Sequence, residues 1–113
     1  MVNIGLVGCG YWGEKYLRVL GDLTDARLTA VCDRDPVLLG KVSQSKPRLF
    51  ITDKYDDLLS SNIDAVVIAT PAVTHFPLAR KALEQGKHVL VEKPFTATSK
   101  EAVELIRLAA EQS

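Results

Sequence analysis

Cysteine is scarce in this chain of 113 residues, which contains only Cys9 and Cys32. Two such thiols form neither a C-x-x-C pair nor a cluster with the spacing of metal ligands, so we expect no metal site. We interpret both as small apolar residues near the ends of strands, where free cysteines are often buried. Reduced thiols of this kind predict a cytoplasmic protein.

Net charge is lacking as well, because 14 Lys and Arg residues balance 14 Asp and Glu residues. The balance gives no bulk electrostatic reason to expect binding to nucleic acid or to an anionic membrane. No apolar run approaches the ~20 residues of a membrane span, and the N-terminal residues lack the basic region and cleavage site of a signal peptide. The remaining composition, 47% hydrophobic and 25% charged, is that of a globular chain, and we expect residues 1–113 to form one domain.

A glycine-rich turn follows the first apolar run of the chain. Residues 4–7 read as a strand, the next residues are Gly8-Cys-Gly-Tyr-Trp-Gly13, and an amphipathic segment comes after them. The order strand, G-x-G-x-x-G, helix is the one that binds a dinucleotide pyrophosphate. Gly8 would permit the sharp turn, Gly10 would leave room for the phosphates, and Gly13 would let the helix pack on the strand.

The second apolar run of the chain ends in a carboxylate, Asp33. Asp33 follows Gly13 by 20 residues, close to the spacing of the group that binds the adenosine ribose hydroxyls. A carboxylate there accepts a hydrogen bond from the 2′-OH and repels a 2′-phosphate, which favours NAD over NADP. Arg34 leaves NADP open, since a guanidinium could pair with that phosphate. The alternative role for Asp33 is a helix N-cap, although Asp35 is better placed for it, directly before a proline.

Apolar runs alternate with helical patterns along the chain, with short connections and no hairpin signals. This alternation predicts an α/β fold, a doubly wound parallel sheet of the Rossmann type with five or six strands. With the phosphate site after the first strand, we expect the strand order 3-2-1-4-5. Ligands of such sheets bind at the carboxyl ends of the strands. After the second strand we expect strands at 48–51, 64–69 and 88–91, and helices that start at Asp35-Pro36, after a cap at Asp53, over 73–85 before Gly86, and over 99–112.

Two later stretches, read together with the glycine turn, match a known family. They are Ala69-Thr-Pro-Ala-Val-Thr-His75 and Gly86-Lys-His-Val-Leu-Val-Glu-Lys-Pro94. The chain closely resembles, over essentially its whole length, the N-terminal NAD(P)-binding domain of the Gfo/Idh/MocA oxidoreductase family. The resemblance implies an oxidoreductase that transfers hydride between a nicotinamide cofactor and a sugar, sugar-nucleotide or polyol hydroxyl.

The resemblance also implies roles for individual residues. Lys93 would lie near the nicotinamide and the reacting carbon, where it would orient the substrate hydroxyl and help its proton leave. Thr70 and Pro71 would line the cofactor, but the family often has Asn where this chain has Ala72, which puts one polar contact in doubt. The other positions assigned to cofactor binding are Tyr11 and Trp12, which would alternatively shield the helix start, His75, which would alternatively pack against the loop, Glu92 and Pro94.

Members of this family continue into a second domain that supplies the substrate pocket, whereas this chain stops at Ser113. We therefore expect a fragment, either an excised cofactor domain or one that a partner chain completes, which binds a dinucleotide but turns over little. Exposure of the face that would meet the second domain would favour self-association. Two other classes stay open, a nucleotide-sensing module and a CoA- or nucleotide-binding subunit, although Asp33 would face the phosphorylated ribose of CoA.

Overall fold

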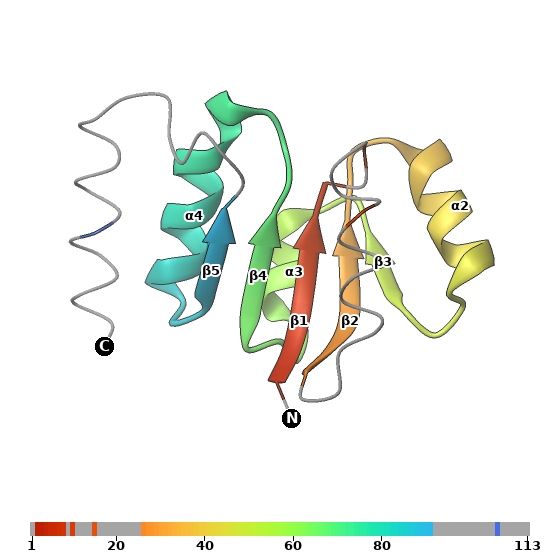
Figure 1. Ribbon diagram of the computed structural model, residues 1–113, viewed down its shortest axis with the longest axis horizontal. Coiled ribbons are helices and arrows are strands. Elements are labelled where there is room, and N and C mark those ends of the chain that lie inside the picture. The colour runs from red at the N-terminus through yellow and green to blue at the C-terminus, as the bar shows by residue number, and fades with distance from the viewer. Residues whose placement is uncertain (1, 9, 11–14, 16–25, 92–105, 107–113) are drawn as a thin grey trace.

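The computed structural model describes residues 2–8, 10, 15, 26–91 and 106 (Figure 1). Strands and helices alternate along this part of the chain, as the sequence predicts. In chain order they are β1 (Val2–Val7), β2 (Ala26–Cys32), α2 (Pro36–Ser45), β3 (Phe50–Thr52), α3 (Tyr55–Ser60), β4 (Ala65–Ile68), the short 3₁₀ helix η1 (Ala72–Thr74), α4 (His75–Glu84) and β5 (His88–Val91).

The strands form one sheet in the order β3-β2-β1-β4-β5, and every neighbouring pair is parallel. This confirms the predicted doubly wound sheet and its strand order. All five arrows point the same way in Figure 1, so their carboxyl ends share the upper edge of the sheet. The order of the strands reverses between β1 and β4, which is where sheets of this kind bind ligands.

Each face of the sheet carries its own apolar cluster. One cluster joins the strands to α3 and α4, which lie behind the sheet in Figure 1, and the other joins the strands to α2. Strand β4 reads AVVI and is buried along most of its length, because a central parallel strand is covered on both faces. The members of the first cluster are Val7, Ala30, Cys32, Leu58, Leu59, Ile63, Val66, Ile68, Ala79 and Ala82, and those of the second are Ile4, Leu6, Val31, Leu39, Val42 and Val67.

Two helix ends follow directly from local sequence. The side chain of Asp35 accepts a hydrogen bond of 2.9 Å from the amide of Val37, so Asp35 is the N-cap of α2 and Pro36 is its first residue. Gly86 ends α4 with a φ of +76°, and its amide donates to the carbonyl of Leu83 while the next amide donates to that of Ala82. These paired bonds make the glycine-dependent helix terminus that the sequence predicts.

Beyond shifts at the ends of β1, β2 and β4, three local predictions differ from the structure. The third strand is Phe50–Thr52, shifted toward the C-terminus from the expected 48–51, because only these residues pair with β2. Asp53 does not cap α3: the N-cap position is Lys54, without a side-chain hydrogen bond, and the hydroxyl of Thr52 accepts from the Lys54 amide instead. The expected helix over 73–85 is split into η1 and α4.

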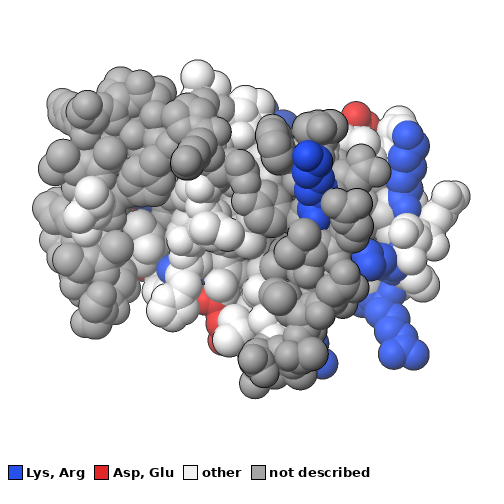
Figure 2. All heavy atoms as spheres, viewed as in Figure 1, with Lys and Arg blue, Asp and Glu red and all other residues white. Residues whose placement is uncertain are grey.

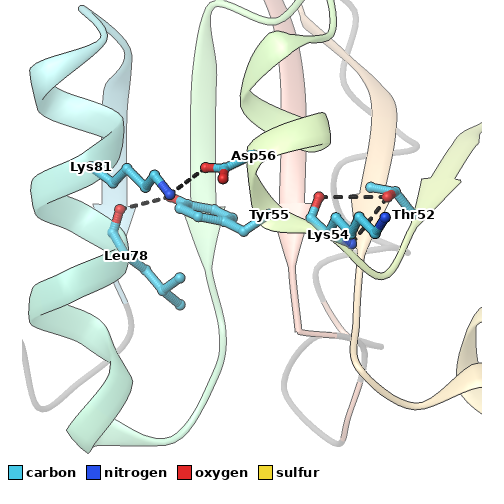
Figure 3. A network of polar contacts seen from close by, with 6 residues as sticks. All are labelled: Thr52, Lys54, Tyr55, Asp56, Leu78 and Lys81. Atoms are coloured by element: carbon cyan, nitrogen blue, oxygen red, sulfur yellow. Dashed lines mark hydrogen bonds and ion pairs between the residues drawn. The ribbon is translucent and has the colours of Figure 1, made fainter.

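Helices α3 and α4 are joined by two polar contacts (Figure 3). The hydroxyl of Tyr55 donates to the carbonyl oxygen of Leu78 at 2.7 Å, and Lys81 forms an ion pair with Asp56. Burial raises the pKa of the Tyr55 hydroxyl well above its ordinary value, so the hydroxyl keeps the proton that it donates. The ion pair is largely exposed to solvent and adds little to stability.

The surface of the described residues shows an uneven distribution of charge. On the face drawn in Figure 2, Lys and Arg side chains gather toward the side occupied by α2 and β3 in Figure 1.

No helix in the described part of the chain is long and apolar enough to cross a membrane.

Candidate nucleotide-binding site

Three of the predicted site residues lie at the carboxyl edge of the sheet. Gly8 directly follows β1, Asp33 directly follows β2, and Thr70 comes two residues after β4. Because β1 is the neighbour of both β2 and β4, the turns that follow these strands meet at this edge. The fold therefore brings together segments that are 25 and 37 residues apart, Gly8 with Asp33 and Asp33 with Thr70.

The turn after β1 is packed directly against the turn after β4. Gly8 has a φ of +97°, and an ideal Cβ built on it would lie 2.5 Å from the carbonyl oxygen of Ala69 and 3.0 Å from the side-chain methyl of Thr70. The amide of Gly8 donates to the carbonyl of Cys32 at 2.9 Å, so the turn is also tied to β2. Only glycine combines this backbone conformation with this close approach, as the sequence predicts for the first glycine of the motif.

Gly10 has the opposite surroundings, because an ideal Cβ on it would meet no atom of the described residues within 4 Å. The residue is exposed and lies two positions after Gly8 on the same turn. The fold itself does not need a glycine here, and the space next to the backbone is open. This arrangement fits a position where phosphate groups approach the main chain.

Asp33 is held in a defined position by the start of α2. Its Oδ1 accepts a hydrogen bond of 2.8 Å from the amide of Asp35, and its own amide donates to the carbonyl of Thr52 at 3.2 Å. The capping of α2 falls to Asp35, so the alternative helix-cap role of Asp33 is not the one observed. Asp33 is partly exposed and Arg34 is exposed, which leaves both accessible from solvent at the carboxyl end of β2.

The turn after β4 is organised by three polar contacts. The Oγ1 atoms of Thr70 and Thr74 are 2.5 Å apart, and the Thr74 hydroxyl donates to the carbonyl of Pro71 at 2.6 Å. The Nε2 atom of His75 lies 2.8 Å from the carbonyl oxygen of Thr70. A carbonyl oxygen can only accept, so Nε2 carries the proton of this bond.

His75 is 1% exposed, the least accessible polar residue in the described core. Its ring fixes the backbone of Thr70 from within the fold, which is the packing role that the sequence left as an alternative. A direct contact between His75 and a cofactor stays a prediction. Sequence reasoning did not single out Thr74, and the signal available was its spacing of four residues from Thr70, one helical turn.

Cys32 lies in the core beneath this edge. Burial, helped by the carboxylates of Asp33 and Asp53, raises the pKa of its thiol to about 11. A neutral buried thiol agrees with the expected apolar role of this cysteine.

Within the described ranges, no three His, Cys, Asp or Glu side chains are grouped as metal ligands would be.

Six of the predicted site residues lie outside the residues that the structure describes. They include the catalytic candidate Lys93, and their assignments stay predictions. The six are Tyr11, Trp12, Gly13, Glu92, Lys93 and Pro94.

Comparison with known proteins identifies the family. The sequence profile described as "Oxidoreductase family, NAD-binding Rossmann fold", that of Gfo/Idh/MocA proteins, matches residues 2–113. The chain belongs to this family. Its fold and the resemblance carried by its motifs are thereby confirmed.

Relatives of this chain carry the names of different activities. The chain is 34% identical to a glycosyl hydrolase family 109 protein of Shewanella amazonensis, over 96% of this chain and 26% of the relative. It is 36% identical to inositol 2-dehydrogenase 1 of Saccharopolyspora erythraea, over 93% of this chain and 32% of the relative. Among solved structures, the WlbA dehydrogenase of Bordetella pertussis, in complex with NADH and UDP-GlcNAcA, matches with a TM-score of 0.91 and 27% identity over 98% of this chain and 34% of that one. This chain thus spans between a quarter and about a third of the length of these relatives.

Proposed function

We propose that this chain is the cofactor-binding part of an NAD-dependent oxidoreductase that acts on a hydroxyl of a sugar, a sugar nucleotide or a polyol. The support for the substrate class is the similarity to an inositol dehydrogenase and to a dehydrogenase that binds a UDP-sugar. NAD is the proposed cofactor and NADP the less favoured one, because a carboxylate, Asp33, follows β2.

The observation that carries the proposal is the contact between the turns after β1 and β4. With Gly8 pressed against Ala69 and Thr70, the open backbone at Gly10 stands at the point where the strand order reverses. Asp33 stands at the end of the neighbouring strand, held by the amide of Asp35. In this arrangement the Gly10 backbone faces the pyrophosphate and the Asp33 carboxylate accepts hydrogen bonds from the adenosine ribose.

When bound, the nicotinamide ring supplies the hydride acceptor, and the chain contributes binding, orientation and charge. Lys93 is the proposed catalytic residue, and its ammonium group would stabilise a developing alkoxide and relay the substrate proton. The remaining acid–base groups and the substrate pocket are assigned to the part of the protein beyond this chain. We expect the chain alone to bind the cofactor and to turn over little, because one lysine cannot position a sugar.

The first experiment is a titration of this chain with NAD+, NADH, NADP+ and NADPH, followed by amide NMR shifts. We expect shifts at Gly8, Gly10, Asp33 and Thr70, and tighter binding of the two NAD forms. A folded sample that shows no shifts with any of the four would contradict the proposal. The nucleotide-sensing alternative also predicts binding, but it has no need of Lys93, so oxidation of a sugar substrate by the whole protein and its loss in Lys93→Ala separates the two.

A second candidate function is cleavage of a glycoside, favoured by the similarity to a glycosyl hydrolase family 109 protein. The two activities differ in their products. An oxidoreductase forms reduced nicotinamide in proportion to the substrate consumed, whereas a glycosidase releases a sugar without a net change in nicotinamide. Both products can be measured in one assay of the whole protein with sugars and glycosides.

A further inference from the structure

The turn after β4 contains a relay of hydroxyl groups whose direction can be worked out. Thr74 has one hydroxyl proton, and its Oγ1 lies 2.6 Å from the carbonyl oxygen of Pro71. Without a proton between them, two acceptor oxygens at this distance would repel, so the Thr74 proton points to Pro71. The Thr74 oxygen is then the acceptor in its contact of 2.5 Å with Thr70, and the Thr70 hydroxyl is the donor.

The position of Thr70 is fixed from two further sides. Its methyl group lies next to Gly8, 3.0 Å from where a Cβ on that residue would stand. Its carbonyl oxygen accepts from Nε2 of the buried His75. With methyl, hydroxyl proton and carbonyl all engaged, the side chain has one orientation at the carboxyl edge of the sheet.

From this geometry we infer that Thr74 is a positioning residue, which makes the β4 turn an acceptor of hydrogen bonds. An acceptor at this place suits a hydroxyl or an amide N–H on the nicotinamide half of the dinucleotide. It does not suit a phosphate. The Thr70 proton is spent on Thr74, so the Thr70 oxygen offers only lone pairs to a ligand. Phosphate oxygens are acceptors as well, so they form no hydrogen bond with the Thr70 oxygen. The inference rests on the proposed function, because it concerns the same cofactor.

With this relay, hydrogen-bond donors and acceptors lie on different turns of the site. The glycine turn exposes backbone N–H groups, which are donors and suit the pyrophosphate. The Thr70 hydroxyl donates its proton to Thr74 and can only accept from a ligand, so it suits the part of the ligand that carries donors. Loss of the Thr74 hydroxyl would leave Thr70 free to turn its proton toward the ligand, and the site would lose its fixed polarity.

The test uses Thr74→Val, which keeps the shape of the side chain and removes its hydroxyl, with Thr74→Ser as the matched control. Three ligands are titrated into the chain of residues 1–113: NAD+, nicotinic acid adenine dinucleotide and ADP. We expect Thr74→Val to weaken NAD+ about fivefold, the effect of one lost hydrogen bond, with ADP affinity unchanged and Thr74→Ser close to wild type. ADP lacks the nicotinamide half, so a general disturbance of the fold would weaken ADP too.

Nicotinic acid adenine dinucleotide shows whether the donor to Thr70 is the carboxamide of the nicotinamide or a hydroxyl of its ribose. If the donor is the carboxamide, Thr74→Val weakens NAD+ but not the analogue, which has a carboxylate there. If the donor is a ribose hydroxyl, both are weakened alike, and either result supports the inference.

Equal losses for all three ligands, or no loss for any, would overturn the inference while leaving the proposed function intact. A wild-type chain that binds none of them would overturn both. Should Thr74→Val fail to fold in a thermal unfolding experiment, Thr74→Ala removes the same hydroxyl without placing a methyl next to Pro71 and carries the same test.

Discussion

The carbonyl oxygen of Ala69 occupies the space that a side chain on Gly8 would need, 2.5 Å from the ideal Cβ position. The two residues are 61 positions apart in the chain, and they meet because β1 and β4 are parallel neighbours with matched ends. The contact fixes the glycine turn against the β4 turn. It makes Gly8 a residue that the fold needs, whatever the site binds.

We therefore expect Gly8→Ala to destabilise the chain by about 2 kcal/mol or more, from the positive φ and the clash together. Urea unfolding measures this loss. The control is Gly40→Ala in α2, where a Cβ meets no atom within 4 Å and the change should stabilise by roughly 0.5 to 1 kcal/mol. Equal stability of the two variants would contradict the importance of the Ala69 contact.

Gly10 should behave differently, because the space beside it is open in the structure. Gly10→Leu is expected to leave the urea midpoint nearly unchanged and to abolish NAD binding, since the side chain would fill the space assigned to the phosphates. The measurement is a dinucleotide titration of the folded variant. Unchanged affinity would remove the pyrophosphate from this turn.

Asp33 and Asp35 offer a matched pair of carboxylates at the start of α2. Asp33→Ala should weaken NAD more than NADP, because the group that accepts from the ribose 2′-OH and repels a 2′-phosphate is gone. Asp35→Ala removes the N-cap of α2 and should reduce stability by about 1 kcal/mol without changing the preference between the two cofactors. Titrations of both variants with NAD+ and NADP+ measure the two affinities. If Asp33→Ala weakens NAD+ and NADP+ binding equally, Asp33 does not bind the ribose.

The Cys32 thiol predicts a loss of stability at high pH. Burial raises the pKa of the folded thiol to about 11, above an ordinary value of 9.0. Between these values the unfolded chain releases the proton and the folded chain keeps it, so the free energy of unfolding falls as pH rises, by roughly 2 to 3 kcal/mol in all.

Urea midpoints from pH 8 to pH 11 should show this decline. Cys32→Ala should flatten the part of the decline that begins near pH 9, leaving the part due to Tyr55, whose raised pKa acts in the same direction at higher pH. A decline that is the same in wild type and variant would show that the Cys32 thiol is not the cause.

The link between α3 and α4 yields a ranking of two side chains. Tyr55→Phe removes the hydrogen bond to Leu78 and should reduce stability by about 1 kcal/mol. Lys81→Met removes only an exposed ion pair with Asp56 and should change stability by less than about 0.5 kcal/mol. Urea unfolding of both variants tests the ranking, and a larger effect of Lys81→Met would reverse our interpretation of Figure 3.

The sequence by itself determined the strand order and the ends of the helices that have local signals. Strand and helix patterns in alternation predict parallel strands with right-handed crossovers, and the glycine turn after the first strand indicates the order 3-2-1-4-5 among the doubly wound sheets. Asp35 with its proline and Gly86 were correct because capping depends on residues within one helical turn. Asp53 was wrong as a cap because α3 begins at Tyr55, which places Lys54 and not Asp53 at the N-cap position.

Only the tertiary structure decided how the site residues are oriented. The burial of His75 and the direction of the Thr70 hydroxyl depend on contacts with η1 and with a turn on another strand. The contact of Thr70 with Gly8 joins residues far apart in the chain, and its geometry is set by strand register and by packing, which no local pattern encodes. The contacts of Thr70 with Thr74 and His75 span only four and five residues, but their geometry depends on how η1 and α4 follow the β4 turn. The motif located the site, and the parallel alignment of β1, β2 and β4 gave it its shape.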